Sequence, residues 1–562
     1  MLRKHQQEML DIIDGIIAGS GVKKIVLHAV PGSGKSLIPI IAGTLITAGL
    51  ADALAWITPR KTLQEQGERG FIDPVFRRML GHSLTIRTST NDRNPCRGTN
   101  GFATTYQAVA METEGILQDE FSRRRYILVL DEFHHVEEGG VWHQALQPLV
   151  DQAGFLILMT GTLSRGDGFP IAFIPYRKTT TGFEPDFGSD PSLRFIAYTR
   201  TEALKEQAIL PLSFALHDGE VEWQKDTKTY SARLSAEAEK PAAAILTAMS
   251  TEFADELLGI GLQHWQDYKA THPRSKALVV VANIMQAKRV VKDLQDMGLQ
   301  AVIATSHDHE GAMKAIKKFK GQQCNVLVSV AMVYEGFDEP QATHIICLTH
   351  IRSQPWIEQM VARVVRIDPH AGPYKAQLGF VFAPDDFLMR RIIAGIESEQ
   401  MACAHAKPEK DTDDSDIPQG GGIGPEQKNC YGITPIGSRL TDQREINLGG
   451  YGPGDYGYDH DAPCAQTQSE IEKELRDQIE SWLRKFAFTN YYRMQRINRE
   501  VKDAFEGKAR ADMTVPELQN VLAHVRNYYP MEKTAPDPWH KRRGSGRRVP
   551  AKAMEWNQLS MF

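Results

Sequence analysis

The sequence predicts an α/β protein built on two parallel sheets, and three observations point to this fold class. With 562 residues the chain is too long for one hydrophobic core, so we expect at least two compact domains. Short apolar runs separated by helical patterns come in two series, which is typical of buried parallel strands. A glycine-rich turn ending in Lys35-Ser36 follows the first run and opens a helical pattern. The runs are 24–29, 53–58, 101–104, 126–130 and 155–159 in the first series, and 277–281, 301–304, 325–328, 344–348 and 379–382 in the second.

The two series set the expected domain boundaries. Between them lies a connector that is rich in Thr, Pro and Gly and then helical, and we expect it to add no sheet. Residues 402–465 hold eleven glycines, and eleven acids against five bases, a composition that cannot bury a core. Apolar residues then recur at helical spacing. The expected parts are a first α/β domain at 1–170, a connector at 171–271, a second α/β domain at 272–398, a flexible linker at 399–465, a helical accessory module at 466–535 and a basic, disordered tail at 536–562.

Composition and charge exclude several classes of protein. Apolar residues make up 42% of the chain and charged residues 24%, which excludes collagen-like, coiled-coil and wholly disordered chains. The net charge of −5 excludes a basic nucleic-acid coat. Six cysteines without CxxC pairing and a start without a signal-peptide core indicate the cytoplasm. The apolar stretch 37–57 is interrupted by Pro39, Gly43 and Gly49, which favours a helix and a buried strand over a membrane span.

The turn Gly32-Ser33-Gly34-Lys35-Ser36 lies between a predicted strand and a predicted helix, where a phosphate-binding loop belongs. Its glycines let backbone N–H groups curl around a β-phosphate, and the helix N-terminus adds a favourable dipole. Lys35 can neutralise β- and γ-phosphate oxygens, and the Ser36 hydroxyl can ligate Mg²⁺. The turn therefore predicts a site for ATP and Mg²⁺.

A pair of carboxylates, Asp131 and Glu132, follows the apolar run 126–130. A strand that ends in this pair brings both groups to the carboxyl edge of the sheet, beside the phosphate loop. Asp131 would hold Mg²⁺, and Glu132 would polarise the attacking water. Two arginines in the second domain, Arg363 and Arg366, would face the nucleotide across a cleft and stabilise charge on the transferred phosphoryl group.

The loop and the carboxylate pair together resemble motifs I and II of superfamily 2 helicases in the DExH form. The pattern is similar to the branch that includes the translocase subunit of type III restriction enzymes, and it implies two tandem RecA-like domains. Ala362 departs from the glycine usual in motif VI, and Leu163-Ser164-Arg165 departs from the usual end of motif III. We find no nuclease signature, so the resemblance does not imply cleavage. The other matches, in order, are 2–6 (adenine recognition), 58–66 (motif Ia), 104–107 (motif Ib), 160–162 (motif III), 330–340 (motif V) and 359–366 (motif VI).

The resemblance also implies roles for the matched residues. Gln6 would bond to the adenine edge, and Gly336 and Asp338 would contact the nucleotide from motif V. The residues implied to touch the DNA backbone are Pro59, Arg60, Thr104 and Thr105. The residues implied to couple the nucleotide site to DNA are His134, Thr160, Thr162 and Gln359.

The C-terminal part of the chain carries weaker signals. The peptide Gln558-Leu559-Ser560-Met561-Phe562 resembles the motif by which bacterial polymerases and repair proteins dock on the sliding clamp. Aromatic residues lie among basic ones over 482–499, which fits either a DNA-binding surface or an amphipathic bundle with a solvated basic face. Cysteine and histidine in 403–464 are too loosely spaced for structural zinc.

The sequence therefore predicts an ATP-dependent DNA helicase or translocase that binds ATP and Mg²⁺ and tracks DNA without strong sequence preference. The peptide at 558–562 further predicts that the sliding clamp recruits the protein to sites of replication, recombination or repair. Two other functions stay open. One is a motor subunit of a restriction or defence system with a separate nuclease, and the other is a nucleotide-gated DNA-binding adaptor with little turnover.

Overall fold

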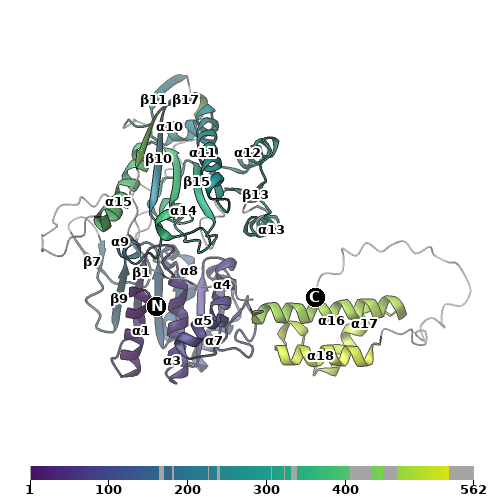
Figure 1. Ribbon diagram of the computed structural model, residues 1–562. Helices are drawn as coiled ribbons and strands as arrows, with labels where there is room; N and C mark the ends of the chain where they lie inside the picture. Colours follow the sequence, from purple (N-terminus) through teal and green to yellow (C-terminus); the bar gives the residue numbers. More distant parts are fainter. Residues whose placement is uncertain are drawn as a thin grey trace, which may run out of the picture. The chain divides into compact units, whose positions relative to one another are not determined.

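The computed structural model shows two compact units (Figure 1). The first comprises Met1–Asn91 with Thr99–Ala465, and the second comprises Asp92–Gly98 with Gln466–Phe562. No helix among the described residues is long and apolar enough to cross a membrane. The described residues are 2–163, 170–179, 183–225, 227–236, 241–305, 307–321, 323–330, 338–404, 433–446, 465–490 and 492–530.

The first unit contains a parallel sheet of seven strands in the order β3-β4-β2-β5-β6-β1-β9. Every residue of β2 and β5 is buried, as expected of central strands packed against helices. The strands are β1 (Lys24–Ala29), β2 (Ala53–Thr58), β3 (Arg87–Thr88), β4 (Gly101–Thr105), β5 (Tyr126–Asp131), β6 (Phe155–Thr160) and β9 (Leu193–Tyr198), and β7 (Tyr176–Lys178) pairs with β8 (Phe183–Pro185) outside this sheet. The helices are α1 (Lys4–Ile17), α2 (Ile38–Ala42), α3 (Thr44–Thr47), α4 (Lys61–Ile72), α5 (Pro74–Leu80), α6 (Tyr106–Met111), α7 (Ile116–Arg123), α8 (Val141–Gln152) and α9 (Arg200–Lys205).

A second sheet in the same unit has the order β11-β10-β16-β15-β12-β14-β13, with β17 paired to β10. All ten strands predicted from the apolar runs exist. The second sheet is parallel from β10 to β13, whereas β11 and β17 run antiparallel to β10, and the two sheets confirm the tandem RecA-like fold class. The strands are β10 (Leu212–Lys225), β11 (Lys228–Arg233), β12 (Lys276–Val281), β13 (Ala301–Thr305), β14 (Val326–Val330), β15 (Ala342–Leu348), β16 (Gly379–Pro384) and β17 (Ile433–Ile446). The helices are α10 (Pro241–Ala248), α11 (Glu252–Thr271), α12 (Ile284–Asp296), α13 (His309–Lys320), α14 (Gln354–Val361) and α15 (Phe387–Ala404).

The connector at 171–271, expected to be a link rather than a third sheet, contributes strands to both sheets. Its strand β9 pairs in parallel with β1 and closes the edge of the first sheet, and β10 pairs in parallel with β16 in the second. The search for apolar runs did not reveal β10, because Asp218 and neighbouring polar residues interrupt its apolar sequence. Asp218 is buried all the same, since its carboxylate accepts hydrogen bonds from Arg233 and Ser235.

The flexible linker expected at 399–465 also needs correction. Helix α15 extends to Ala404, and β17 runs antiparallel to β10 along its whole length, from Lys225 opposite Ile433 to Phe214 opposite Ile446. This strand is polar and mostly exposed, as an edge strand is, so composition alone did not reveal it.

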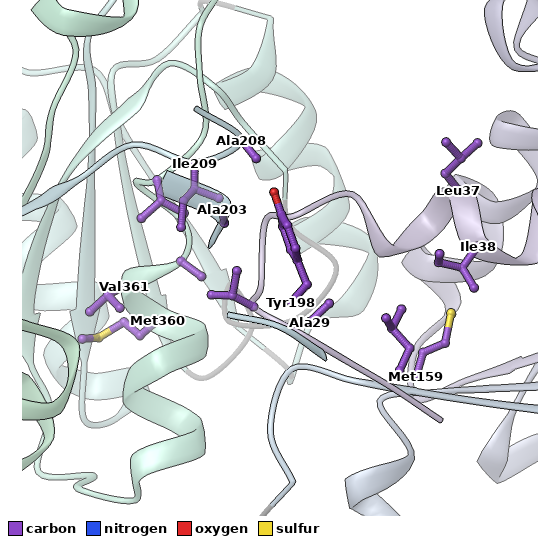
Figure 2. Packing of buried hydrophobic residues seen from close by; sticks show 14 of the residues in the cluster. Ala29, Leu37, Ile38, Met159, Tyr198, Ala203, Ala208, Ile209, Met360 and Val361 are labelled. Atoms are coloured by element: carbon purple, nitrogen blue, oxygen red, sulfur yellow. The ribbon is translucent and has the colours of Figure 1, made fainter. Parts of the chain in front are cut away.

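One apolar cluster joins the two sheets of the first unit (Figure 2). It includes Leu37 and Met159 beside the phosphate loop and Met360 and Val361 of α14. Ile209, from the connector, belongs to the same cluster. The connector is therefore part of the packing that holds the two sheets together.

The second unit is a bundle of three helices. Its core contains Ile479, Leu483 and Phe486 of α16 with Ile497 of α17, so the predicted helical spacing is confirmed there. A third helix, α18, completes the core and was not predicted. The bounds are α16 (Gln468–Asn490), α17 (Met494–Ala504) and α18 (Val515–Tyr528).

A short loop from the middle of the first domain's sequence belongs to this bundle. Asp92–Gly98 lies between β3 and β4 in the chain, yet its contacts assign it to the second unit. The Arg97 guanidinium pairs with the Glu472 carboxylate of α16 at 3.4 Å, and both side chains are at most 2% exposed. Arg476, one turn along α16, pairs with the same carboxylate at 2.8 Å.

Candidate nucleotide-binding site

The phosphate loop leaves β1 at Ala29 and passes through two glycines with left-handed backbone, Gly32 at φ +97° and Gly34 at φ +85°. Only glycine adopts these angles without strain. The loop ends in a 3-10 turn at Lys35–Leu37, which leads into the short helix α2. The predicted strand, loop and helix are thus present, although the helix starts with a tighter turn than expected.

The loop meets the requirements for a bound phosphate. The Ser33 hydroxyl oxygen is buried and has no hydrogen-bond partner among the described residues. The Ser36 side chain is exposed at the start of the helix, where a cation ligand is expected. A phosphate could accept a hydrogen bond from the unpaired Ser33 hydroxyl, and the Ser36 hydroxyl could ligate the accompanying cation. The residues of the turn therefore fit ATP and Mg²⁺.

Lys35 and Glu132 form the centre of the site. The Lys35 ammonium donates to Glu132 Oε1 at 2.6 Å, and the Gly161 N–H donates to Glu132 Oε2 at 3.1 Å. Burial alone would raise the pKa of Glu132, but the Lys35 ammonium and the hydrogen bonds outweigh it and hold the pKa well below its usual range. Motifs I, II and III therefore meet at one ionised carboxylate.

Asp131 is the last residue of β5 and is buried. Burial, followed by the adjacent Glu132 charge, raises the pKa of Asp131 above that of an ordinary aspartate. A nearby divalent cation would favour the ionised form, because opposite charge stabilises a carboxylate. The backbone carbonyl of Asp131 accepts a hydrogen bond from the buried Tyr106 hydroxyl at 2.8 Å, a contact that sequence patterns did not predict.

The adenine-recognition segment contacts the phosphate loop directly. Gln6 is buried, and its amide donates to the Gly34 carbonyl at 3.1 Å and accepts from the Arg3 N–H at 3.0 Å. The Arg3 guanidinium lies 3.5 Å from the Gly32 carbonyl. Contact of Gln6 with adenine stays a prediction, whereas its contact with the loop, and that of Arg3, are additions from the structure.

The two motif VI arginines occupy different positions. Arg366 lies against the phosphate loop, because a Cβ on Gly32 would come within 2.8 Å of its Nη1 atom. The Arg366 guanidinium also pairs with Asp338 at 3.1 Å. Arg363, which lies two residues beyond the end of α14, is buried and donates to the Gln359 carbonyl of that helix at 3.1 Å. The sequence treated these arginines alike, whereas the structure places Arg366 against the loop and bonds Arg363 to the preceding helix.

The coupling residues of motifs II and III form a hydrogen-bonded chain. His134 Nδ1 lies 2.8 Å from the Thr160 hydroxyl, which donates to the Thr162 carbonyl at 2.7 Å. Burial lowers the pKa of His134, so its ring is neutral. The Gln359 side-chain oxygen is buried without a hydrogen-bond partner among the described residues. The structure thus joins His134, Thr160 and Thr162 but not Gln359.

The residues implied to touch DNA lie at the carboxyl ends of two neighbouring strands. Strand β2 ends at Thr58 and β4 at Thr105, and the two strands pair in parallel. Pro59 and Arg60 are half-buried, and Thr104 is buried. The Thr105 hydroxyl accepts the Ala108 N–H at 3.1 Å and so caps α6. Accepting this bond does not use the hydroxyl hydrogen of Thr105, so its contact with a DNA phosphate stays a prediction.

Two predicted sets lie outside the described residues. Gly336 and most of motif V fall in 331–337, and the clamp-like peptide at 558–562 falls in 531–562. Among the described residues, no group of three or more His, Cys, Asp or Glu side chains is placed to hold a metal ion.

Comparison with known families agrees with this geometry. Residues 1–165 match the family model for the Res subunit of type III restriction enzymes, and residues 256–368 match the helicase conserved C-terminal domain. The two matches support a superfamily 2 helicase core. The first covers the phosphate loop and the carboxylate pair, and the second covers both motif VI arginines. A helicase core of this family implies the use of ATP, typically with Mg²⁺.

The curated relatives are distant mycobacterial proteins. The uncharacterized protein ML1624 of Mycobacterium leprae is 23% identical over 404 residues, which span 69% of this chain and 63% of that protein. The uncharacterized protein Rv2917 of Mycobacterium tuberculosis is 24% identical over 359 residues, which span 62% of this chain and 57% of that protein. The chain thus spans about three fifths of the length of the curated relatives it matches.

Solved structures show a distant likeness. The Mycobacterium smegmatis helicase Lhr bound to ssDNA and AMP-PNP has a TM-score of 0.46 at 16% identity, over 72% of this chain and 48% of that one. A fragment of a putative HsdR subunit of a type I restriction enzyme from Vibrio vulnificus has a TM-score of 0.44 at 15% identity, over 69% of this chain and 65% of that one. S. cerevisiae Dbp5 bound to RNA and ADP BeF3 has a TM-score of 0.41 at 12% identity, over 71% of this chain and 91% of that one.

Proposed function

We propose that this chain is an ATP-dependent DNA helicase or translocase. The observation that carries the proposal is the meeting of Lys35, Glu132 and Arg366 at one phosphate loop, because these groups come from both sheets of the first unit. Arg366 comes from the part of the chain that carries the second sheet, and the phosphate loop comes from the part that carries the first sheet. Hydrolysis should therefore depend on how the two sheets are positioned relative to one another. That dependence is what converts hydrolysis into movement along a strand.

Each residue has a distinct task in this mechanism. ATP with Mg²⁺ supplies the phosphoryl group that is transferred. With nucleotide bound, Lys35 would leave its pair with Glu132 to neutralise the phosphates, and Ser36 and Asp131 would hold the cation. Glu132, oriented by the Gly161 N–H, polarises the attacking water and takes up its proton. Arg366 stabilises the charge that develops on the phosphoryl oxygens.

Steady-state ATP hydrolysis tests the motor directly. We would compare no nucleic acid, single-stranded DNA, duplex, forked DNA and RNA, with Lys35→Ala as the blank. DNA should stimulate a rate that the blank lacks, and the best substrate would separate unwinding from duplex translocation. Preferential stimulation by RNA would contradict the choice of DNA. If no nucleic acid stimulates hydrolysis, the motor assignment fails and the adaptor with little turnover takes its place.

Glu132→Gln tests the role of the carboxylate. The amide keeps an oxygen for the Gly161 N–H but loses the charge that faces Lys35 and the ability to take up a proton. We expect ATP binding to persist while turnover stops. Binding measured by a fluorescent ATP analogue, with the hydrolysis rate of the same preparation, would decide it. Normal turnover would remove Glu132 from this role.

The terminal peptide at 558–562 supports a second part of the proposal, recruitment by the sliding clamp to replication, recombination or repair. Deletion of these residues should abolish capture of the protein by immobilised clamp. A chain with the same five residues in scrambled order is the matched control and should fail likewise. Retained capture by either variant would refute this recruitment.

The match of residues 1–165 to a restriction-enzyme subunit favours one other candidate, a motor subunit of a restriction or defence system. Such a subunit would act with a nuclease on a separate chain. DNA cleavage that appears only when the protein is combined with a neighbouring-gene product would support this candidate over repair.

A further inference from the structure

The two ends of α16 carry opposite charge. Residues 468–480 contain five acids against two bases, whereas residues 484–502, which continue into α17, contain six bases and one acid. All six of these bases are exposed. A polyanion would therefore be repelled from the start of α16 and attracted to its end. We call this region the basic end; its bases are Arg484, Lys485, Arg493, Arg496, Arg499 and Lys502.

A large aromatic side chain stands within the basic end. Phe488 is 77% exposed, whereas Phe486, two residues earlier, is 4% exposed and packs on Tyr492 and Tyr529 with ring centroids 5.4 and 5.1 Å apart. The core is thus filled without Phe488. The Phe488 ring is therefore available for stacking, and the cations of the basic end distinguish it from an isolated exposed side chain.

A groove of about 990 Å³ runs along the same side of α16 toward Phe488. Ser481 and Lys485 line it, and Phe488 lies at the next helical step of that side. The guanidinium of Arg526, from α18, lies over the Trp482 ring at 5.7 Å. The groove is lined by Glu470, Glu474 and Asp477 at its acidic end and by Trp482, Lys485 and Arg526 at the end near Phe488.

Several of the cations have no charged partner of their own. Lys485, Arg493 and Arg499 form no ion pair among the residues that the structure describes, while Arg484 pairs with Glu480 and Arg496 with Glu500. Exposed cations that precede and follow an exposed aromatic residue in the chain match a strand of alternating phosphates and bases.

We propose that the basic end binds single-stranded DNA, with an unstacked base on the Phe488 ring and phosphates on Lys485, Arg493 and Arg499. A single strand fits better than a duplex, because base faces are available for stacking only outside a duplex. The inference deepens the proposed function and rests on it for the class of ligand. The second unit would then bind DNA through a site of its own, in addition to the contacts implied at the carboxyl ends of β2 and β4 in the first unit.

Fluorescence anisotropy on the full chain tests the stacking contact. The probe is a labelled oligothymidylate of about 20 nucleotides, without ATP. Phe488→Ala should raise the Kd at least about fivefold, the lower end of the effect of losing one stacking side chain, and Phe488→Trp should restore it. Tyr528→Ala is the matched control and should bind as the unaltered chain does. Tyr528 is 71% exposed, stacks on His524 at 4.3 Å and points away from Arg526 on α18.

Salt dependence tests the binding of phosphates. Replacing Lys485, Arg493 and Arg499 together by Ala should make the slope of log affinity against log salt less negative, by roughly 0.7 for each phosphate that is no longer neutralised. The same titrations with duplex DNA and an oligouridylate decide the ligand. A Kd of Phe488→Ala within about twofold of the unaltered chain would overturn the proposal. So would an equal loss on duplex, or a loss confined to RNA. Failure of the motor proposal is a different result, namely no nucleic-acid stimulation of Lys35-dependent hydrolysis, and it leaves this comparison intact.

Discussion

The buried pair between Arg97 and Glu472 should be the main electrostatic tie that holds loop 92–98 in the helical bundle. Its atoms lie 3.4 Å apart, and their side chains are 2% and 1% exposed. At an effective dielectric constant of about 20 the attraction is about 5 kcal/mol, which offsets the cost of burying both charges. Glu472→Ala removes this carboxylate from Arg97, which keeps its pair with Asp92 at 3.1 Å, and from Arg476, so we expect it to destabilise the bundle by about 1–3 kcal/mol.

Hydrogen exchange of the α16 amides is the appropriate assay, because it reports the opening of the bundle separately from unfolding of the first unit. Protection of α16 should fall by roughly 5- to 150-fold in Glu472→Ala. Arg484→Ala is the matched control, since its pair with Glu480 is exposed and contributes about 0.5 kcal/mol or less. Combining Arg97→Ala with Glu472→Ala should cost less than the sum of the two single changes. Strict additivity would refute the reasoning, as would unchanged protection in Glu472→Ala.

Three further predictions concern the first unit. Gly67→Ala should lower its free energy of unfolding by about 1–3 kcal/mol in urea titrations, because the new Cβ would come within 2.7 Å of the buried Trp56 ring, and an unchanged midpoint would show that the ring can move aside. Arg366→Ala should slow steady-state ATP hydrolysis by roughly 10³-fold or more while nucleotide binding persists, and an unaltered rate would exclude it as the cation at the phosphate loop. Burial lowers the pKa of His5 from 6.5 to about 3 and that of His217 to about 4, so the unfolded chain binds more protons below pH 6.5. The contribution of the two neutral histidines to the free energy of unfolding should be complete above pH 6.5 and should fall toward pH 4 by about 1.4 kcal/mol per pH unit for each histidine. Urea titrations across this pH range would check it, and a free energy of unfolding that does not change with pH would contradict it.

Local patterns were sufficient for the central strands and the phosphate loop. Strands such as β2 and β5 are buried along their whole length, so their apolar runs are visible in the sequence without knowledge of any neighbour. The glycines of the loop need left-handed backbone, a property that is also local. The contact between Lys35 and Glu132 followed from the rule that parallel strands present their carboxyl ends at one edge.

Edge strands were missed because their pairing depends on partners distant in the sequence. Strand β17 is polar and glycine-containing, and it forms only because β10 offers a free edge about two hundred residues earlier. Buried polar residues such as Asp218 and His217 likewise look like loop residues until the fold supplies their surroundings.

The sequence by itself determined which chemistry this protein can perform, because nucleotide chemistry needs particular side chains at fixed local spacing. The tertiary structure alone decided which of those side chains meet. It separated Arg366, which lies against the phosphate loop, from Arg363, which donates to the last turn of the preceding helix α14. It also placed loop 92–98 in the helical bundle through the Arg97–Glu472 pair, although 375 residues separate the partners. Such contacts depend on the packing of whole elements, which no short window of sequence contains.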